Sequence, residues 1–72
     1  MTHYFSVEDL DESEIKLYSI KAESKIEAER LFCKKFTPYV NMTFDFILNL
    51  FGDKDIDIKY LGTEEDIIKL FL

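Results

Sequence analysis

The sequence predicts a small α+β sandwich in which a ββα unit occurs twice, giving a four-stranded antiparallel sheet with two helices on one face. First, the segments 24–32 and 63–71 share a pattern: a hydroxyl residue, an acid three positions later, then a base, ending in Leu-Phe. Second, apolar alternation typical of strands precedes the first segment and, less regularly, the second. Third, the 72 residues are 47% hydrophobic with only two Gly and one Pro. This composition fits one domain spanning residues 1–72.

The first two strands are expected at residues 3–8 and 15–22, joined as a hairpin. Phe5 and Val7 would share one face of the first strand. Five acids in the seven residues 8–14 predict an exposed turn. In the second strand the apolar alternation slips by one position between Leu17 and Ile20. Two explanations remain open, a β-bulge and a strand buried on both faces.

A capped helix is expected to follow this hairpin. Ser24 and Glu27 match the S-x-x-E capping box, in which each side chain accepts from a backbone N–H of the other residue. Pro38 disfavours an α conformation at Thr37, so the helix should end near residue 36. The positions at helical spacing, which should face the sheet, are Ala28, Leu31, Phe32 and Phe36.

The segment 40–51 fits two templates. Ten of its twelve positions obey strand alternation. A helix would instead align Phe44, Ile47, Leu48 and Phe51. We favour the strand because Phe, Ile and Thr prefer strands and Asn is a mediocre helix former. The alternative is the order ββααβα with residues 38–51 helical.

The remaining elements complete the second ββα unit. After a turn around Gly52, residues 56–60 alternate as a half-buried strand, which Gly62 should end. Thr63 then caps the last helix, with Asp66 in the place that Glu27 takes in the first.

Charge and cysteine content narrow the class of protein. Fifteen acidic against nine basic residues give a net charge of −6, which repels nucleic acid and anionic membranes and favours basic protein surfaces. The single cysteine excludes an intramolecular disulfide and fits a reducing compartment. The first ten residues lack the pattern of a signal peptide, and no apolar run approaches the roughly 20 residues of a membrane helix. We therefore expect a cytoplasmic protein that binds neither membrane nor nucleic acid directly.

Two acidic segments are the first candidate site. In a repeated ββα plan both hairpin loops lie at the same end of the sheet, so their acids would form one negative pole. A solubilising surface with no partner is the competing interpretation. The expected partner-binding residues are Asp9, Asp11, Glu12, Glu14, Asp53, Asp55 and Asp57.

The function expected from this surface is non-enzymatic docking on a basic patch of a partner protein, as an inhibitor or adaptor. A sharper version is a nucleic-acid mimic, whose acids occupy a nucleic-acid-binding groove. In size and charge the chain is similar to small acidic phage-encoded anti-restriction and anti-CRISPR proteins, although it shows no family motif. Acids at alternate strand positions lie about 7 Å apart, a sparse imitation of the charge every ~1.7 Å along duplex DNA.

Metal and enzyme chemistry are not expected. Asp53, Asp55, Asp57 and Glu64 occupy positions 1, 3, 5 and 12 of an EF-hand-like loop, but Ile58 stands where that loop needs Gly. Cys33 and His3 are the one nucleophile–base pair that the composition offers, and a structural thiol is the simpler interpretation of Cys33. We expect no cofactor and no bound metal.

The apolar C-terminus is the second candidate site. A short helix buries about one apolar stripe, and this segment carries more apolar residues than one stripe holds. The alternative function is therefore a self-associating scaffold subunit, such as a homodimer. Its expected contacts are Ile67, Ile68, Leu70, Phe71 and Leu72.

Overall fold

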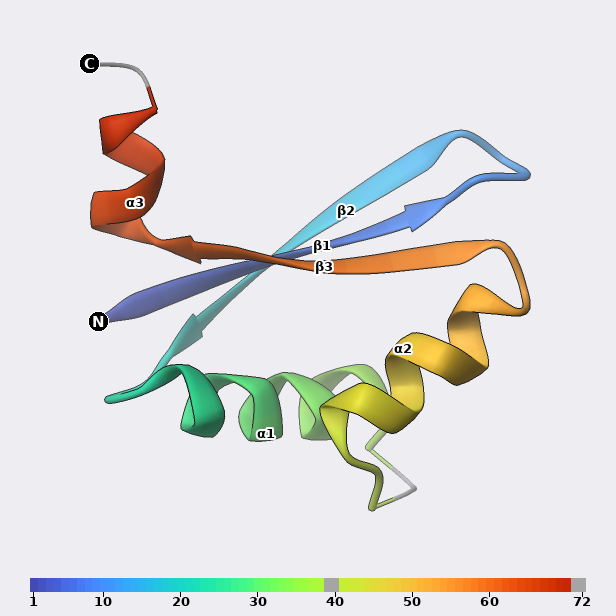
Figure 1. The fold of residues 1–72 in the computed structure, drawn as a ribbon, viewed down its shortest axis with the longest axis horizontal. Helices are drawn as coiled ribbons and strands as arrows, with labels where there is room; N and C mark the ends of the chain where they lie inside the picture. Colours follow the sequence, from blue (N-terminus) through green and yellow to red (C-terminus); the bar gives the residue numbers. More distant parts are fainter. Residues whose placement is uncertain (39–40, 71–72) are drawn as a thin grey trace.

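In the computed structural model, which describes residues 1–38 and 41–70, three strands and three helices follow the order ββααβα. The antiparallel sheet has the strand order β2-β1-β3. Helices α1 and α2 cover one face, and α3 lies on the other side of the strands, at the end remote from the β1–β2 turn (Figure 1). The elements are β1 (Thr2–Asp9), β2 (Glu14–Lys21), α1 (Lys25–Phe36), α2 (Phe44–Gly52), β3 (Ile56–Thr63) and α3 (Glu64–Lys69).

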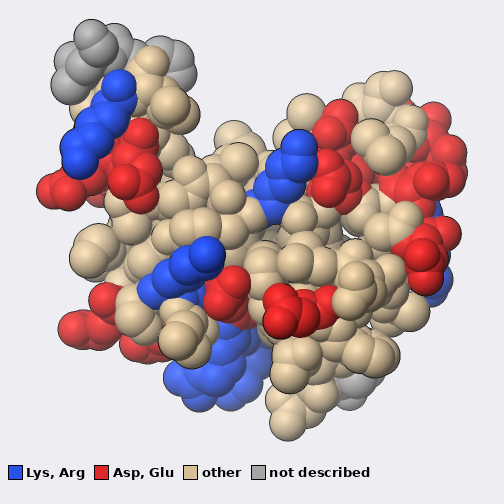
Figure 2. Space-filling model, viewed as in Figure 1, with Lys and Arg blue, Asp and Glu red and all other residues tan. Residues whose placement is uncertain are grey.

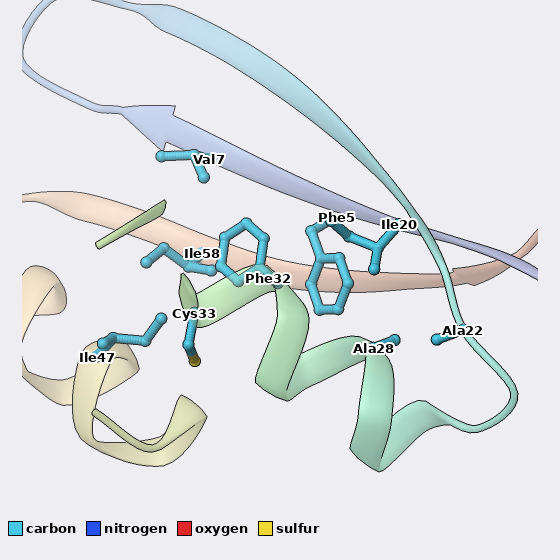
Figure 3. Packing of buried hydrophobic residues seen from close by; sticks show 9 residues of the cluster. All are labelled: Phe5, Val7, Ile20, Ala22, Ala28, Phe32, Cys33, Ile47 and Ile58. Atoms are coloured by element: carbon cyan, nitrogen blue, oxygen red, sulfur yellow. The ribbon is translucent and has the colours of Figure 1, made fainter. Parts of the chain in front are cut away.

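The core lies between the sheet and the first two helices (Figure 3). Alternate residues of β1 point toward α1, and the ring of Phe5 stacks on Phe32 with centroids 4.5 Å apart. Ser24 caps α1 by accepting a hydrogen bond from the Glu27 amide, which is one half of the predicted capping box. The buried apolar residues are Phe5, Val7, Ile20, Ala22, Ala28, Phe32, Cys33, Ile47 and Ile58.

The prediction of a four-stranded sheet was wrong, because the expected third strand is helix α2. Thr43 caps this helix by accepting from the amide of Phe46 at 3.3 Å. Ile47 is fully buried against the sheet, and the helical neighbours expected from the alternative pack around the core beside it. That alternative agrees with the observed order of elements, although the helix begins at Phe44 rather than at residue 38. Val40 lies outside the described residues.

The predicted ββα repeat is also wrong. Within residues 1–38 and 41–70 only one hairpin forms, and the second helix on the covered face is α2 rather than the C-terminal helix. Thr63 and Asp66 do form the reciprocal capping box. Yet α3 has six residues and buries none of them, whereas α1 has twelve and buries three. The shared capping motif therefore identifies where two helices begin, but it is not evidence of a duplicated unit.

Strand β2 is regular, so neither explanation of the slipped alternation holds. Its pairing with β1 runs without interruption from Thr2↔Lys21 to Asp9↔Glu14. Ile20 faces the helices, while Ile15 and Leu17 point to the opposite face and are 62% and 69% exposed. The apolar alternation slips because apolar residues occupy both faces of this strand, and one of these faces is exposed.

Gly62 does not end β3, which runs to Thr63. The register with β1 shifts between Tyr4 and Phe5, which leaves an extra residue in β3. Gly62 lies in the left-handed region with φ +104°, and a Cβ there would approach Asp66 Oδ2 to 2.9 Å. A glycine is thus required to turn the strand into the cap of α3.

Candidate functional site

The acidic end of the molecule is defined by the β1–β2 turn and the α2–β3 turn, which lie side by side (Figure 1). The amide of Leu10 donates a 3.0 Å hydrogen bond to the carbonyl oxygen of Asp55, and Asp9 pairs with Ile56 across the sheet. Two segments more than forty positions apart are therefore held together. The acids they carry are the seven predicted ones: Asp9, Asp11, Glu12, Glu14, Asp53, Asp55 and Asp57.

Asp9 shapes the first turn. Its Oδ1 accepts from the backbone amides of Asp11 at 3.1 Å and Glu12 at 3.3 Å. Ser13 closes the turn in the left-handed region with φ 56°. These bonds orient the turn so that the carboxylates of Asp11 and Glu12 remain exposed. Asp9 is thus as much a structural residue as a contact residue.

The second turn is built from backbone hydrogen bonds at the end of α2. The amide of Lys54 donates to Phe51 at 3.0 Å, and the amide of Asp55 donates to Gly52 at 3.2 Å. Asp55 takes a positive φ of 59°, which aims its carbonyl at Leu10. Asp53 is exposed on this turn.

Asp57 is the least available of the seven acids. Its carboxylate lies 3.4 Å from Lys59 Nζ and is 39% exposed. It also points to the open face of the sheet, beside Glu8 on β1, rather than toward the turns. Within the described part of the chain, no ion pair engages Asp11, Glu12, Glu14 or Asp53. These four acids and Asp55, which is also exposed, carry most of the available charge of the acidic end.

The charges separate over the surface. Figure 2 shows acidic side chains gathered around the two turns, while basic side chains collect below, over α1. Lys34 and Lys35 in the last turn of α1 contribute to that basic region. The acidic end therefore presents a concentrated negative field, and the rest of this face is mixed.

The two residues of the rejected enzyme hypothesis are both buried. Burial raises the pKa of the Cys33 thiol, and the Glu29 carboxylate adds to that rise. His3 is 2% exposed in β1, and its Nδ1 lies 2.9 Å from the hydroxyl of Tyr60. No hydrogen bond joins His3 to Cys33 in the described ranges. A raised pKa keeps Cys33 a thiol near neutral pH, where a thiolate is the reactive form.

The acids of the rejected calcium loop do not converge. Asp55 precedes β3 and Glu64 follows it, so the length of the strand separates them. Among the residues that the structure places, no cluster of three or more potential metal-ligating side chains occurs. Nor is any helix in these ranges long and apolar enough to cross a bilayer.

The second candidate site is only partly described. Ile67 is half-buried, Ile68 is 54% exposed and Leu70 is 80% exposed. Leu70, the C-cap residue of α3, is therefore not part of a buried stripe. Phe71 and Leu72 lie outside the described residues.

Two further surfaces were not expected from the sequence. A groove between α1 and the start of α2 is lined by side chains that include Glu29, Arg30 and Met42. The open face of the sheet exposes Ile15 and Leu17. The slipped alternation was the signal for the second surface. The groove had no signal in the sequence, because its walls come from separate elements.

No protein-family model, curated protein or solved structure matches the chain. The functional argument therefore depends on the geometry and charge of its own residues. Of the surfaces described above, the acidic end is the one where tertiary structure gathers the most acidic side chains, although Lys54 lies in the same α2–β3 turn.

Proposed function

We propose that this chain is a non-enzymatic, cytoplasmic binding module that docks its acidic end on a basic surface of a partner protein, as an inhibitor or adaptor. The observation that carries the proposal is the hydrogen bond from the Leu10 amide to the Asp55 carbonyl. It unites two acidic turns that are remote in sequence into one surface. A set of carboxylates held on paired turns is preorganised for charge complementarity.

Docking of this kind has a definite mechanism. The exposed acids of the acidic end steer a basic partner by long-range attraction and then exchange solvent for lysine or arginine contacts. A nucleic-acid-binding groove is one such basic surface. The acids imitate phosphates only sparsely, since alternate strand positions lie about 7 Å apart. Occupation of a groove would therefore depend on a few strong contacts rather than on a continuous backbone imitation.

The test is an affinity pull-down from host lysate with washes at low and high salt. The variant neutralises the acidic end: Asp11→Asn, Glu12→Gln, Glu14→Gln and Asp53→Asn. The control removes the same amount of charge from exposed acids elsewhere: Glu23→Gln, Asp45→Asn, Glu64→Gln and Glu65→Gln. We expect a partner that is lost at high salt and lost from the acidic-end variant, while the control retains it. A partner that survives neutralisation of the acidic end contradicts the proposal.

A second candidate, a self-associating scaffold that uses α3, is supported by the exposure of Ile68 and Leu70. In that case Ile68→Glu should give a folded monomer, measured by sedimentation. A wild type that is monomeric at high concentration, or a variant that stays dimeric, contradicts this candidate.

A further inference from the structure

Strand β2 is an edge strand whose outer side has no neighbour. Within the described ranges it contacts only β1 and α1. It is eight residues long, contains no proline and pairs without a bulge. Such an edge presents a row of backbone N–H and C=O groups ready to pair with another strand. Charged residues are a common protection of edges, and here Glu14, Lys16 and Lys21 are the ones present.

The open face of the same strand adds an apolar contact surface. Ile15 and Leu17 point away from α1 and stand next to one another along the strand direction. Both side chains are mostly exposed. An exposed apolar pair beside a free strand edge is the combination from which strand-addition interfaces are built.

We propose that β2 is a homodimer interface, in which two copies pair their β2 strands antiparallel about a two-fold axis perpendicular to the sheet. The result is a continuous six-stranded sheet in the order β3-β1-β2-β2-β1-β3. This proposal shares one residue, Glu14, with the acidic end and holds whether or not the acidic end binds a partner.

The occupant is a second copy because the strand is complementary to itself. Facing residues of an antiparallel pair share one side of the sheet, so residue numbers that face each other must add to an even number. When Leu17 faces Leu17 of the second copy, Ile15 faces Ser19, and Lys16 faces Tyr18. On the open face, the apolar side chains of both copies then form one continuous row.

Adjacent registers are worse. A shift in one direction places Lys16 opposite its own counterpart, and like charges directly opposite one another are destabilising. A shift in the other direction places Ile15 opposite Lys21. The register centred on Leu17 is the one that avoids both.

Electrostatics also permits this dimer despite the net charge of −6. Antiparallel pairing sends the two acidic ends in opposite directions. The nearest equivalent acids, Glu14 of each copy, are six residues apart in register, or about 20 Å. That exceeds the Debye length of about 8 Å at physiological salt, so repulsion is largely screened. In addition, Lys21 of one copy faces Ser13 of the other, between Glu12 and Glu14.

The experiment is a register-specific cross-link. In Leu17→Cys the new thiols face each other, at a separation that a disulfide spans. In Ser19→Cys they are offset by four residues, or about 14 Å, beyond disulfide reach. We expect the first variant, and a mixture of Ile15→Cys with Ser19→Cys, to form disulfide-linked dimers under mild oxidation. Ser19→Cys alone and the wild type, whose Cys33 is buried, should not.

Sedimentation of variants completes the test. Leu17→Lys places like charges opposite one another and should weaken dimerisation at least about tenfold. Circular dichroism shows whether Leu17→Lys is folded. If this variant does not fold, the cysteine cross-links alone test the dimer. The single variants Asp53→Asn, in the α2–β3 turn, and Ile68→Glu, in α3, lie outside β2 and should remain dimeric, which separates this proposal from the functional ones. A wild type that is monomeric at high concentration overturns the proposal. So does equal cross-linking at positions 17 and 19, or a β2 edge that pairs only with a strand of another protein.

Discussion

The two faces of this sheet differ in almost every respect, although the same three strands form both. On the face covered by α1 and α2, Phe5 and Phe32 are fully buried and stacked. On the open face, Leu17 is 69% exposed. The covered face supplies the core of a 72-residue chain, and the open face leaves apolar side chains exposed. The core of the fold is thus formed on one side of the sheet.

Aromatic packing explains how a core on one face of the sheet can stabilise so small a domain. The Phe32 ring lies within 6.0 Å of four aromatic partners, Phe5, Tyr18, Phe36 and Phe44, counted between centroids. Large rings bury much apolar area per residue, and favourable ring pairs add about 0.5–1.5 kcal/mol each beyond that area. A few aromatic residues therefore do what a larger domain achieves with many aliphatic ones.

The largest expected effect comes from truncating one apolar side chain on each side of the sheet. Phe32→Ala should lower the free energy of unfolding by about 3–5 kcal/mol, because it opens a cavity where several rings meet. Leu17→Ala, on the open face, should change the stability of the monomer by no more than about 0.5 kcal/mol. Urea denaturation at a concentration where the protein is monomeric measures both.

A total stability of about 5–15 kcal/mol is ordinary for native proteins, so Phe32→Ala alone could unfold this one. Phe36→Leu, at the half-buried margin of the same cluster, is then the milder variant to compare with Leu17→Ala. Similar losses on the two faces would mean that the open face is covered in solution.

A second test concerns the polar pair at the edge of the covered face. Tyr60→Phe removes the hydroxyl that meets Nδ1 of the buried His3. An unsatisfied buried polar group costs about 1–3 kcal/mol, and in the described structure Nε2 of His3 already lacks a partner. Thermal unfolding should show a loss of that size.

Tyr4→Phe is the matched control, since Tyr4 lies half-buried on the other side of β1. Its loss should be a few tenths of a kcal/mol. The double variant His3→Leu with Tyr60→Phe should recover part of the stability, because both partners are then apolar. If Tyr60→Phe and Tyr4→Phe lost equal stability, the hydrogen bond between Tyr60 and His3 would not contribute to the stability of the fold.

Local patterns predicted the elements whose burial is one-sided. The first strand, α1 and the capped start of α3 were found from Phe5, Ser24 and Thr63, where the periodicity and the capping residues agree. The segment containing α2 was misassigned because Phe46 and Leu50 are apolar on the outer side of the helix. Phe46 is 55% exposed, so the strand-like alternation came from side chains that the core does not use.

The acidic end was predicted from a wrong fold and still occurs. The repeat placed the two acidic segments together by symmetry, whereas the structure does so by pairing β3 with β1 and by the bond between Leu10 and Asp55. No local pattern predicts that bond, because it depends on which strand lies next to β1. Nor did sequence show that Asp57 is paired with Lys59 or that Asp9 holds its own turn.

The smallest effect is expected in α3, which belongs to neither packed face. Hydrogen bonds from the Thr63 amide, at 3.0 Å, and the Thr63 hydroxyl, at 3.1 Å, hold the pKa of Asp66 below its usual 3.8. A lowered carboxyl pKa in the folded state means that the cap contributes stability above the unfolded value. This contribution is lost as the pH falls through the folded value. As the pH falls below about 4, NMR should show the amides of α3 losing order before those of α1.

Asp66→Asn should remove that dependence on pH, because the amide does not titrate in this range. The core should be unaffected in both proteins, since α3 buries no residue. If α1 and α3 instead lost order together as the pH fell, the helix would be coupled to the covered face. The contrast between a packed face and a loosely attached remainder would then have to be abandoned.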